Sequence, residues 1–211
     1  MSNLLSLRRA FLTDLTGTIL TRNNQGLVAI ADSHSKPSKR VSEAFLANLP
    51  AGEVSDKVAG QKAGSLFEAA CATFLETCLP HLYSVRPGNW QVSRDAAETG
   101  GLTAFAQYSH LADLAELTKQ HAQLATVLGN DYIIKPDIVL WRKPLADQEL
   151  DPEVTFLDNH FPAYTSLRLT NNSNPLLLAS VSCKWTIRSD RAQNARSEAL
   201  NLIRNRKGRT P

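Results

Sequence analysis

Apolar residues recur at helical spacing through the first part of the chain. The pattern predicts one helix over residues 4–15 and a shorter amphipathic helix over 41–49. The polar stretch 23–39 between them is typical of a loop. A third helix is expected over 64–79, where a proline follows the apolar stripe. We therefore expect a mainly helical N-terminal part, about residues 1–85.

Strand patterns predominate in the second half of the chain. Residues 87–93 favour a short strand, and 102–128 favour one or two helices closed by Gly129. Residues 132–141 are rich in β-branched and aromatic side chains, which predicts a strand buried on both faces with a local break at Pro136.

A second buried strand is expected over 176–186, after a long irregular segment, 143–175. A helix should follow from about 190 to 206. The two-residue period of a strand places Ser182 and Lys184 on one face of the second strand. That face is polar, which is unusual for a buried strand.

Together these elements predict an α/β fold, with a central mixed sheet flanked by helices. We expect a single domain over 1–211 with its catalytic core at about 130–206. A strand followed by a helix normally returns to another parallel strand through a right-handed crossover. Few residues follow the last helix, so we expect the sheet to lack further C-terminal strands, either because it ends there or because the sequence is truncated.

Composition narrows the class of protein. The chain is 43% hydrophobic, yet no stretch reaches the roughly 20 apolar residues of a membrane helix, and no signal-like run opens it. Three cysteines fit a reducing compartment, since Cys71 and Cys78 lie seven residues apart on one predicted helix, too far for a disulfide. We expect a soluble, cytoplasmic protein that binds no membrane, with Cys71 and Cys78 serving in packing and Cys183 lying in the second strand.

Positive charge is concentrated at one end of the chain. Residues 184–211 hold eight Lys or Arg and two acidic residues, whereas the other 183 residues hold 15 basic and 18 acidic ones. A basic cluster of this kind suits a polyanion such as a nucleic acid. A solvated helix face followed by a tail explains the charge equally well.

Several charged residues fall where burial is costly. Asp137 interrupts an apolar run, Glu198 shares a helix face with apolar residues, and Glu68 lies on the apolar stripe of the third helix. Such a set suits metal-assisted phosphodiester hydrolysis, in which Asp137 holds magnesium (Mg²⁺) and Lys184 aligns the attacking water. The structural alternative is that these residues form buried ion pairs without a catalytic role.

The same residues carry a resemblance to a known family. Pro136-Asp137 is followed 47 residues later by Lys184, within Ser182-Cys183-Lys184, and 14 residues further on by Glu198. In this pattern the chain resembles the NgoMIV family of type II restriction endonucleases, a branch of the PD-(D/E)XK nucleases. The resemblance is closest over 182–209 and extends more loosely over essentially the whole chain.

The resemblance implies a role for each of these residues. The wider superfamily has an acid two residues before the lysine, where this chain has Ser182, and the family takes that acid from the next helix, which implies Glu198. It further implies that Asp137 is the shared metal ligand and that the backbone carbonyl of Cys183 completes the Mg²⁺ site. The resemblance also implies that Glu68 contacts the metal ligands and does not bind the metal itself.

Residues 188–191 form a candidate reader of DNA sequence. A helix N-terminus that presents Arg188, Asp190 and Arg191 suits the major groove, since Arg pairs with guanine and Asp accepts from cytosine N4. The alternative is a helix cap flanked by solvated arginines. By resemblance these residues read the central CCGG of GCCGGC, and Asp32 and Gln61 are candidates for outer or minor-groove contacts.

The resemblance implies a Mg²⁺-dependent type II restriction endonuclease that acts on double-stranded DNA. Cutting both strands of a palindrome needs two symmetric sites, so we expect at least a homodimer, and the resemblance implies a homotetramer. Two alternatives stay open. One is a non-catalytic, sequence-specific DNA-binding module, and the other is a less specific repair-type or resolvase-type nuclease.

Overall fold

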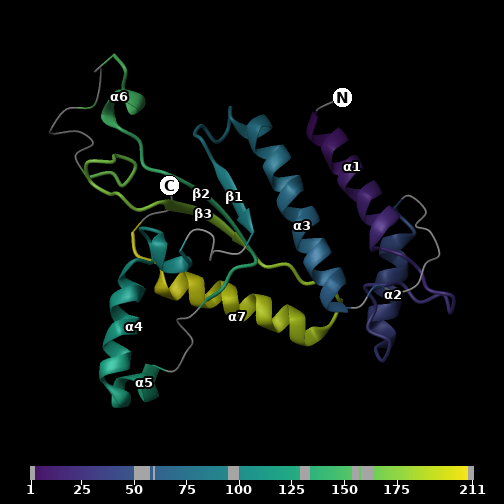
Figure 1. Cartoon of the computed structure of the whole chain (residues 1–211). Helices are drawn as coiled ribbons and strands as arrows, with labels where there is room; N and C mark the ends of the chain where they lie inside the picture. The colour runs from purple at the N-terminus through teal and green to yellow at the C-terminus, as the bar shows by residue number, and fades with distance from the viewer. Residues whose placement is uncertain are drawn as a thin grey trace. The chain divides into compact units, whose positions relative to one another are not determined.

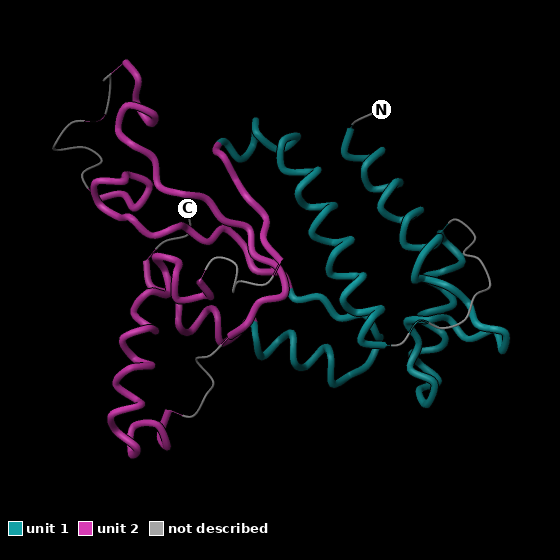
Figure 2. Tube along the Cα trace, in the orientation of Figure 1, with its two compact units in different colours: residues 1–87, 182–198 teal, residues 88–181, 199–211 magenta. Residues whose placement is uncertain are grey.

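The computed structural model describes residues 3–49, 58, 60–94, 100–128, 134–153, 157 and 164–208. The chain divides into two compact units (Figure 2). Unit 1 comprises residues 1–87 and 182–198, and unit 2 comprises residues 88–181 and 199–211. Each unit has a hydrophobic core of its own.

Unit 1 is helical, as its apolar spacing predicts (Figure 1). It contains α1 (Asn3–Thr18), α2 (Lys36–Leu46), α3 (Gly60–Cys78) and a short 3₁₀ turn, η1 (Leu79–Leu82). It also holds residues 189–198, which belong to α7 (Ser189–Asn205). The first and third predicted helices are confirmed, although α3 begins one turn earlier than expected.

The second helix, α2, starts five residues before its predicted start. The prediction that the loop extends to residue 39 was therefore wrong. Ser35 caps the helix, since its side chain accepts a hydrogen bond from the Ser38 N–H at 3.3 Å. Pro37 occupies the first turn, where a missing N–H costs nothing. Both are sequence signals for a helix start.

The core of unit 1 joins α1, α2 and the loop between them. Its buried members are Leu15, Ile19, Leu20, Val28, Ile30 and Leu46. Trp185 and Ile187, from the segment before α7, pack against this core, and Trp185 lies 5.4 Å from Phe67 of α3 between ring centroids. The chain entering α7 is therefore anchored by apolar contacts within unit 1.

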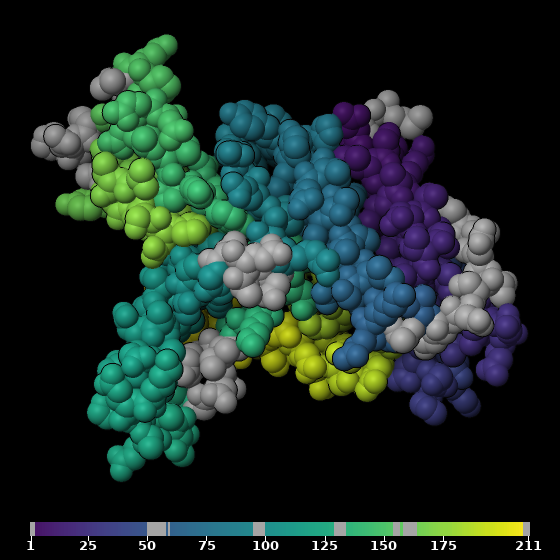
Figure 3. All heavy atoms as spheres, in the orientation of Figure 1, coloured from purple at the N-terminus to yellow at the C-terminus, as the bar shows by residue number. Residues whose placement is uncertain are grey.

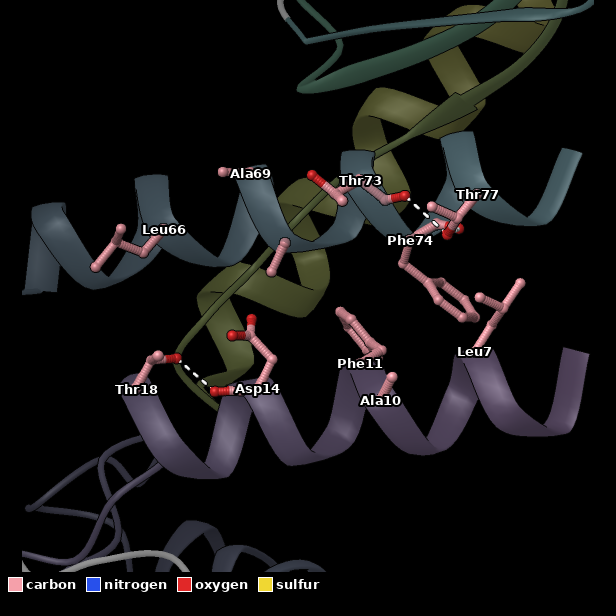
Figure 4. Close-up of a pocket in the computed structure, with 11 residues that line it drawn as sticks. Leu7, Ala10, Phe11, Asp14, Thr18, Leu66, Ala69, Thr73, Phe74 and Thr77 are labelled. Carbon is pink, nitrogen blue, oxygen red and sulfur yellow. Dashed lines mark hydrogen bonds between the residues drawn. The ribbon is translucent and has the colours of Figure 1, made fainter.

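A groove of about 560 Å³ lies between α1 and α3 (Figure 4). Phe11 and Phe74 face one another across it with ring centroids 4.8 Å apart. Asp14 is the one charged residue among the described residues that line it. The lining contains none of the predicted site residues, and Glu68 and Cys71 lie on another stripe of α3.

Unit 2 contains the sheet. Its elements are β1 (Gln91–Arg94), η3 (Leu102–Ala104), α4 (His110–Gln120), α5 (Ala122–Leu128), β2 (Ile138–Arg142), α6 (Asp147–Leu150), β3 (Leu176–Val181) and the last residues of α7. The strand order is β1-β2-β3. Helices and sheet confirm the α/β class. Where a mixed sheet was expected, the named strands that the structure describes pair only antiparallel.

Both predicted buried strands were too long. β2 begins at Ile138, so Asp137 lies immediately before the strand rather than in its middle, because Pro136 has no N–H to donate to a ladder. β3 ends at Val181, whose register partner is Ile138, the first residue of β2. Residues 182–186 therefore continue past the end of the ladder as irregular chain, and the expectation that Cys183 lies in a strand was wrong.

The outer edge of β3 is closed by a side chain. The amide of Gln107, which is buried, donates to the Leu177 carbonyl at 2.9 Å and accepts from the Leu177 N–H at 3.1 Å. Nearby Leu102, Phe105 and Tyr108 join Val139 and Leu177 in the core of unit 2. The helices expected over 102–128 are confirmed as α4 and α5, whereas Gly129 and residues 132 and 133 lie outside the described residues.

Cys71, Cys78 and Cys183 are free thiols. Cys78 is buried and Cys71 half-buried. Within the described residues, none of the helices combines the length and apolar character that a bilayer crossing requires.

Candidate active site

Glu198 stands between two of the predicted site residues. The Ser182 hydroxyl donates to Glu198 Oε2 at 2.5 Å, and Lys184 Nζ lies 3.4 Å from Glu198 Oε1. Ser182 and Lys184 are alternate residues of an extended segment, so both side chains reach the same side even though the strand has ended. The structure thus brings together Ser182, Lys184 and Glu198, which we name the Glu198 cluster.

The Glu198 cluster is partly exposed. The side chain of Lys184 is 21% exposed and that of Glu198 is 36% exposed. Solvent reaches both side chains in part, which leaves room for a cation or a phosphate to approach the cluster. Its orientation is nevertheless set by two partners that approach different oxygens of one carboxylate.

Oxygen donors of this kind fit magnesium. Mg²⁺ keeps several waters and binds through one or two carboxylates plus substrate phosphate. Glu198 offers such a carboxylate, and its Lys184 partner balances the charge before a cation arrives. In the described part of the chain, no group of three or more His, Cys, Asp or Glu side chains gathers as a metal cage. A structural cage of that kind is not what a Mg²⁺ site requires.

Asp137 belongs to unit 2, where it is half-buried at the start of β2. The register pairs Ile138 with Val181 as the last residues of the ladder. Asp137 therefore precedes the final pair on one strand, and Ser182 follows it on the other. Its role as a metal ligand stays a prediction.

Glu68 and Cys71 lie one turn apart on α3, and Cys71 contacts Cys183. A hydrogen bond between the two thiol groups lowers the pKa of Cys71, against burial and the Glu68 carboxylate, both of which raise it. This contact ties α3 to the segment that carries Lys184. The contact was not predicted, because helix spacing assigns Cys71 to packing alone and carries no signal for a partner 112 residues away.

The predicted readers stand at the N-terminus of α7. Arg188 and Asp190 form a two-pronged ion pair, with Nε–Oδ1 and Nη2–Oδ2 both at 3.0 Å, and their side chains are 47% and 51% exposed. Arg191 is also exposed. Among its described residues α7 has none buried, and its yellow atoms reach the surface in the space-filling view (Figure 3).

Asp32 lies beside this group of readers. Ala31 forms a parallel bridge with Ile187, so Asp32 and Arg188 are the next residues on two adjacent segments. The Asp32 carboxylate also accepts from the His34 N–H at 3.0 Å, which holds a tight turn. Gln61 is exposed in the first turn of α3. Its proposed contact with DNA stays a prediction.

The chain is similar in sequence to known proteins. The sequence model of the family described as NgoMIV restriction enzyme matches residues 12–211. The type II restriction enzyme NgoMIV of Neisseria gonorrhoeae is 44% identical over 201 residues, a match that covers 93% of this chain and 69% of that enzyme.

The α/β fold and the Glu198 cluster, together with these matches, define a protein of the type II restriction enzyme class. More narrowly, the chain belongs to the NgoMIV restriction enzyme family. The resemblance found in the sequence is thereby confirmed.

Proposed function

We propose that this chain is a Mg²⁺-dependent, site-specific endonuclease that hydrolyses both strands of double-stranded DNA at GCCGGC. The observation that carries the proposal is the Glu198 cluster. It joins a carboxylate, a lysine and a hydroxyl at the positions that the family pattern marks, immediately beyond a strand end.

Asp137, Glu198 and the backbone carbonyl of Cys183 are the proposed holders of Mg²⁺. When bound, the ion polarises the phosphodiester and lowers the pKa of a bound water. The protein supplies the oxygen donors and their orientation. Ser182 restrains one oxygen of Glu198, and Glu68 is proposed to act from behind the ligands.

Lys184 is proposed to position the attacking water and offset the charge that develops on the phosphate. Its ammonium group has three N–H donors, and the contact with Glu198 occupies one of them. N–H donors of this kind suit substrate and water oxygens. Hydrolysis then needs no covalent enzyme intermediate, because water is the nucleophile.

Sequence reading is proposed to fall to Arg188, Asp190 and Arg191 for the central CCGG, with Asp32 and Gln61 for the outer base pairs. The Arg188–Asp190 ion pair is exposed to solvent. Breaking it therefore costs little free energy, and each side chain can then contact a base edge instead. Arg donors suit guanine and the Asp carboxylate suits cytosine, which favours a site of G·C pairs.

A palindromic target is best cut by a symmetric assembly, so we propose a homodimer, with two dimers pairing into a homotetramer. Since its proposed substrate is DNA, its action is proposed to be cytoplasmic.

Incubation with supercoiled plasmids tests the function. One plasmid carries GCCGGC and a matched plasmid carries GCGCGC in its place, each in Mg²⁺ and in Ca²⁺. We expect Mg²⁺-dependent double-strand cleavage of the first plasmid alone. Specific binding without cleavage would favour a non-catalytic DNA-binding module, and cleavage of both plasmids would favour a less specific nuclease.

A further inference from the structure

Ser38 is a buried hydroxyl that joins two segments far apart in the sequence. It lies in the first turn of α2 and is 5% exposed. Its Oγ donates to the Ile187 carbonyl at 2.7 Å and accepts from the Asp32 N–H at 2.9 Å. One partner is a proposed outer reader, and the other immediately precedes Arg188, a proposed central reader.

The position of this hydroxyl is itself fixed on α2. The Ser38 N–H donates to Ser35 Oγ at 3.3 Å, in the cap that begins α2. The Ser38 hydroxyl therefore bonds the two segments from the first turn of α2. A buried hydroxyl that both donates and accepts a hydrogen bond fixes the positions of its two backbone partners relative to each other.

The two segments also pair through their backbones. The Ile187 N–H donates to the Ile30 carbonyl at 2.9 Å, within the bridge that pairs Ala31 with Ile187. The bridge ends there, because Asp32 turns away toward His34. The Ser38 hydroxyl adds a link of its own, from the backbone of Asp32 to that of Ile187.

We infer that Ser38 is a positioning residue for sequence readout, one that sets Asp32 in register with Arg188 so that outer and central base pairs are read together. This inference rests on the proposed function. Base readout needs side chains held to within about 0.5 Å, which a backbone-anchoring hydroxyl supplies and an exposed reading side chain cannot supply for itself.

Ser42 offers a matched control on the same helix. It is also a buried serine, with 0% exposure, and its hydroxyl also bonds a backbone carbonyl. Its partner is the Ser38 carbonyl, one turn back on α2, rather than either reading segment. Ser42→Ala should therefore cost stability without altering readout.

The test compares binding to three duplexes in Ca²⁺, carrying GCCGGC, ACCGGT or GCGCGC. For Ser38→Ala we expect the preference for GCCGGC over ACCGGT to fall at least about fivefold, the lower end of what one base contact is worth. The preference for GCCGGC over GCGCGC, which reports the central base pairs, should fall less than about twofold, which is below the worth of one base contact. Ser38→Thr, which restores the hydroxyl, and Ser42→Ala should both keep the wild-type ratios.

Equal weakening on all three duplexes, or the same ratio change in Ser42→Ala, would show a merely structural role and overturn the inference. If Ser38→Ala fails to fold, Ser38→Cys carries the test, since its thiol is a weak donor and acceptor and should lower the outer-pair ratio. If the Ser38 variant discriminates between GCCGGC and ACCGGT as the wild type does, the inference is overturned and the proposed function is not. A wild-type protein that does not prefer GCCGGC overturns the proposed target and this inference with it.

Discussion

Two ion pairs of unit 1 lie about two turns apart along α7 and differ in nearly every respect. Glu198 contacts Lys184 and Ser182, which come from the segment before the helix, and all three side chains are partly buried. Arg188 and Asp190 contact each other, two residues apart, with about half of each side chain exposed.

The difference matches the two tasks that we propose for these residues, catalysis and sequence reading. The Glu198 cluster is held by non-local contacts before any substrate binds, as electrostatic catalysis requires. The Arg188–Asp190 pair is local and solvated, so it loses little when its members turn to base edges. Substitutions at the cluster should therefore alter chemistry, and substitutions at the exposed pair should alter recognition.

The largest effect is expected for Glu198→Gln. This change keeps the shape of the side chain but removes the charge that Lys184 faces and a metal would bind. We expect the cleavage rate to fall by about 10²–10³-fold or more, with affinity for GCCGGC in Ca²⁺ little changed. Single-turnover cleavage of an oligonucleotide duplex measures it.

A matched control is Glu116→Gln, since Glu116 also faces a lysine, Lys119, at 3.2 Å but is 60% exposed on α4. It should cleave at the wild-type rate. Equal losses in both variants would mean that the Glu198 cluster has no special part in the chemistry.

A smaller effect, on recognition, is expected for Arg191→Ala. Loss of one guanine contact should reduce discrimination at a central G·C pair by about 1–3 kcal/mol. Binding to GCCGGC and GCGCGC duplexes measures the ratio. Arg204→Ala, an exposed arginine in the last turn of α7, should weaken binding to both duplexes alike and reduce the salt dependence. An unchanged ratio in Arg191→Ala would remove this residue from the readers.

The smallest effects concern stability. Ser182→Ala removes a partly buried hydrogen bond to a charged group and should lower the free energy of unfolding by about 1–2 kcal/mol. Arg188→Ala removes an exposed ion pair and should lower it by less than about 1 kcal/mol. Urea unfolding of both variants tests the order, and the reverse order would contradict the contrast between the two pairs.

Local sequence signals located α1, α3 and α7, although they placed the start of α2 five residues too late and did not predict α6. The expected limits of the last helix, about 190 and 206, agree with Ser189–Asn205 to within one residue, because apolar spacing and charge mark that helix along its own length. The strand ends were wrong because they depend on partners. β3 ends where Val181 meets Ile138, and no property of residues 182–186 reveals that.

The candidate site was predicted only in part, because local spacing reveals which side chains share a face but not which distant residues they contact. Spacing along one strand correctly put Ser182 and Lys184 on the same side, and helix periodicity turned Glu198 toward them. Ser38 was missed, because its partner Ile187 lies 149 residues away and a serine in a polar loop carries no periodic signal. The roles of Asp137, Glu68 and Gln61 stay predictions from the family pattern.

The most direct test of the separation between chemistry and reading is a single titration of Lys184→Ala on a GCCGGC duplex. The account predicts binding in Ca²⁺ within about threefold of wild type, because the readers are intact, and no detectable cleavage after Mg²⁺ is added. Cleavage at the wild-type rate would contradict the assignment of the Glu198 cluster. Loss of specific binding in a folded variant would contradict the separation itself.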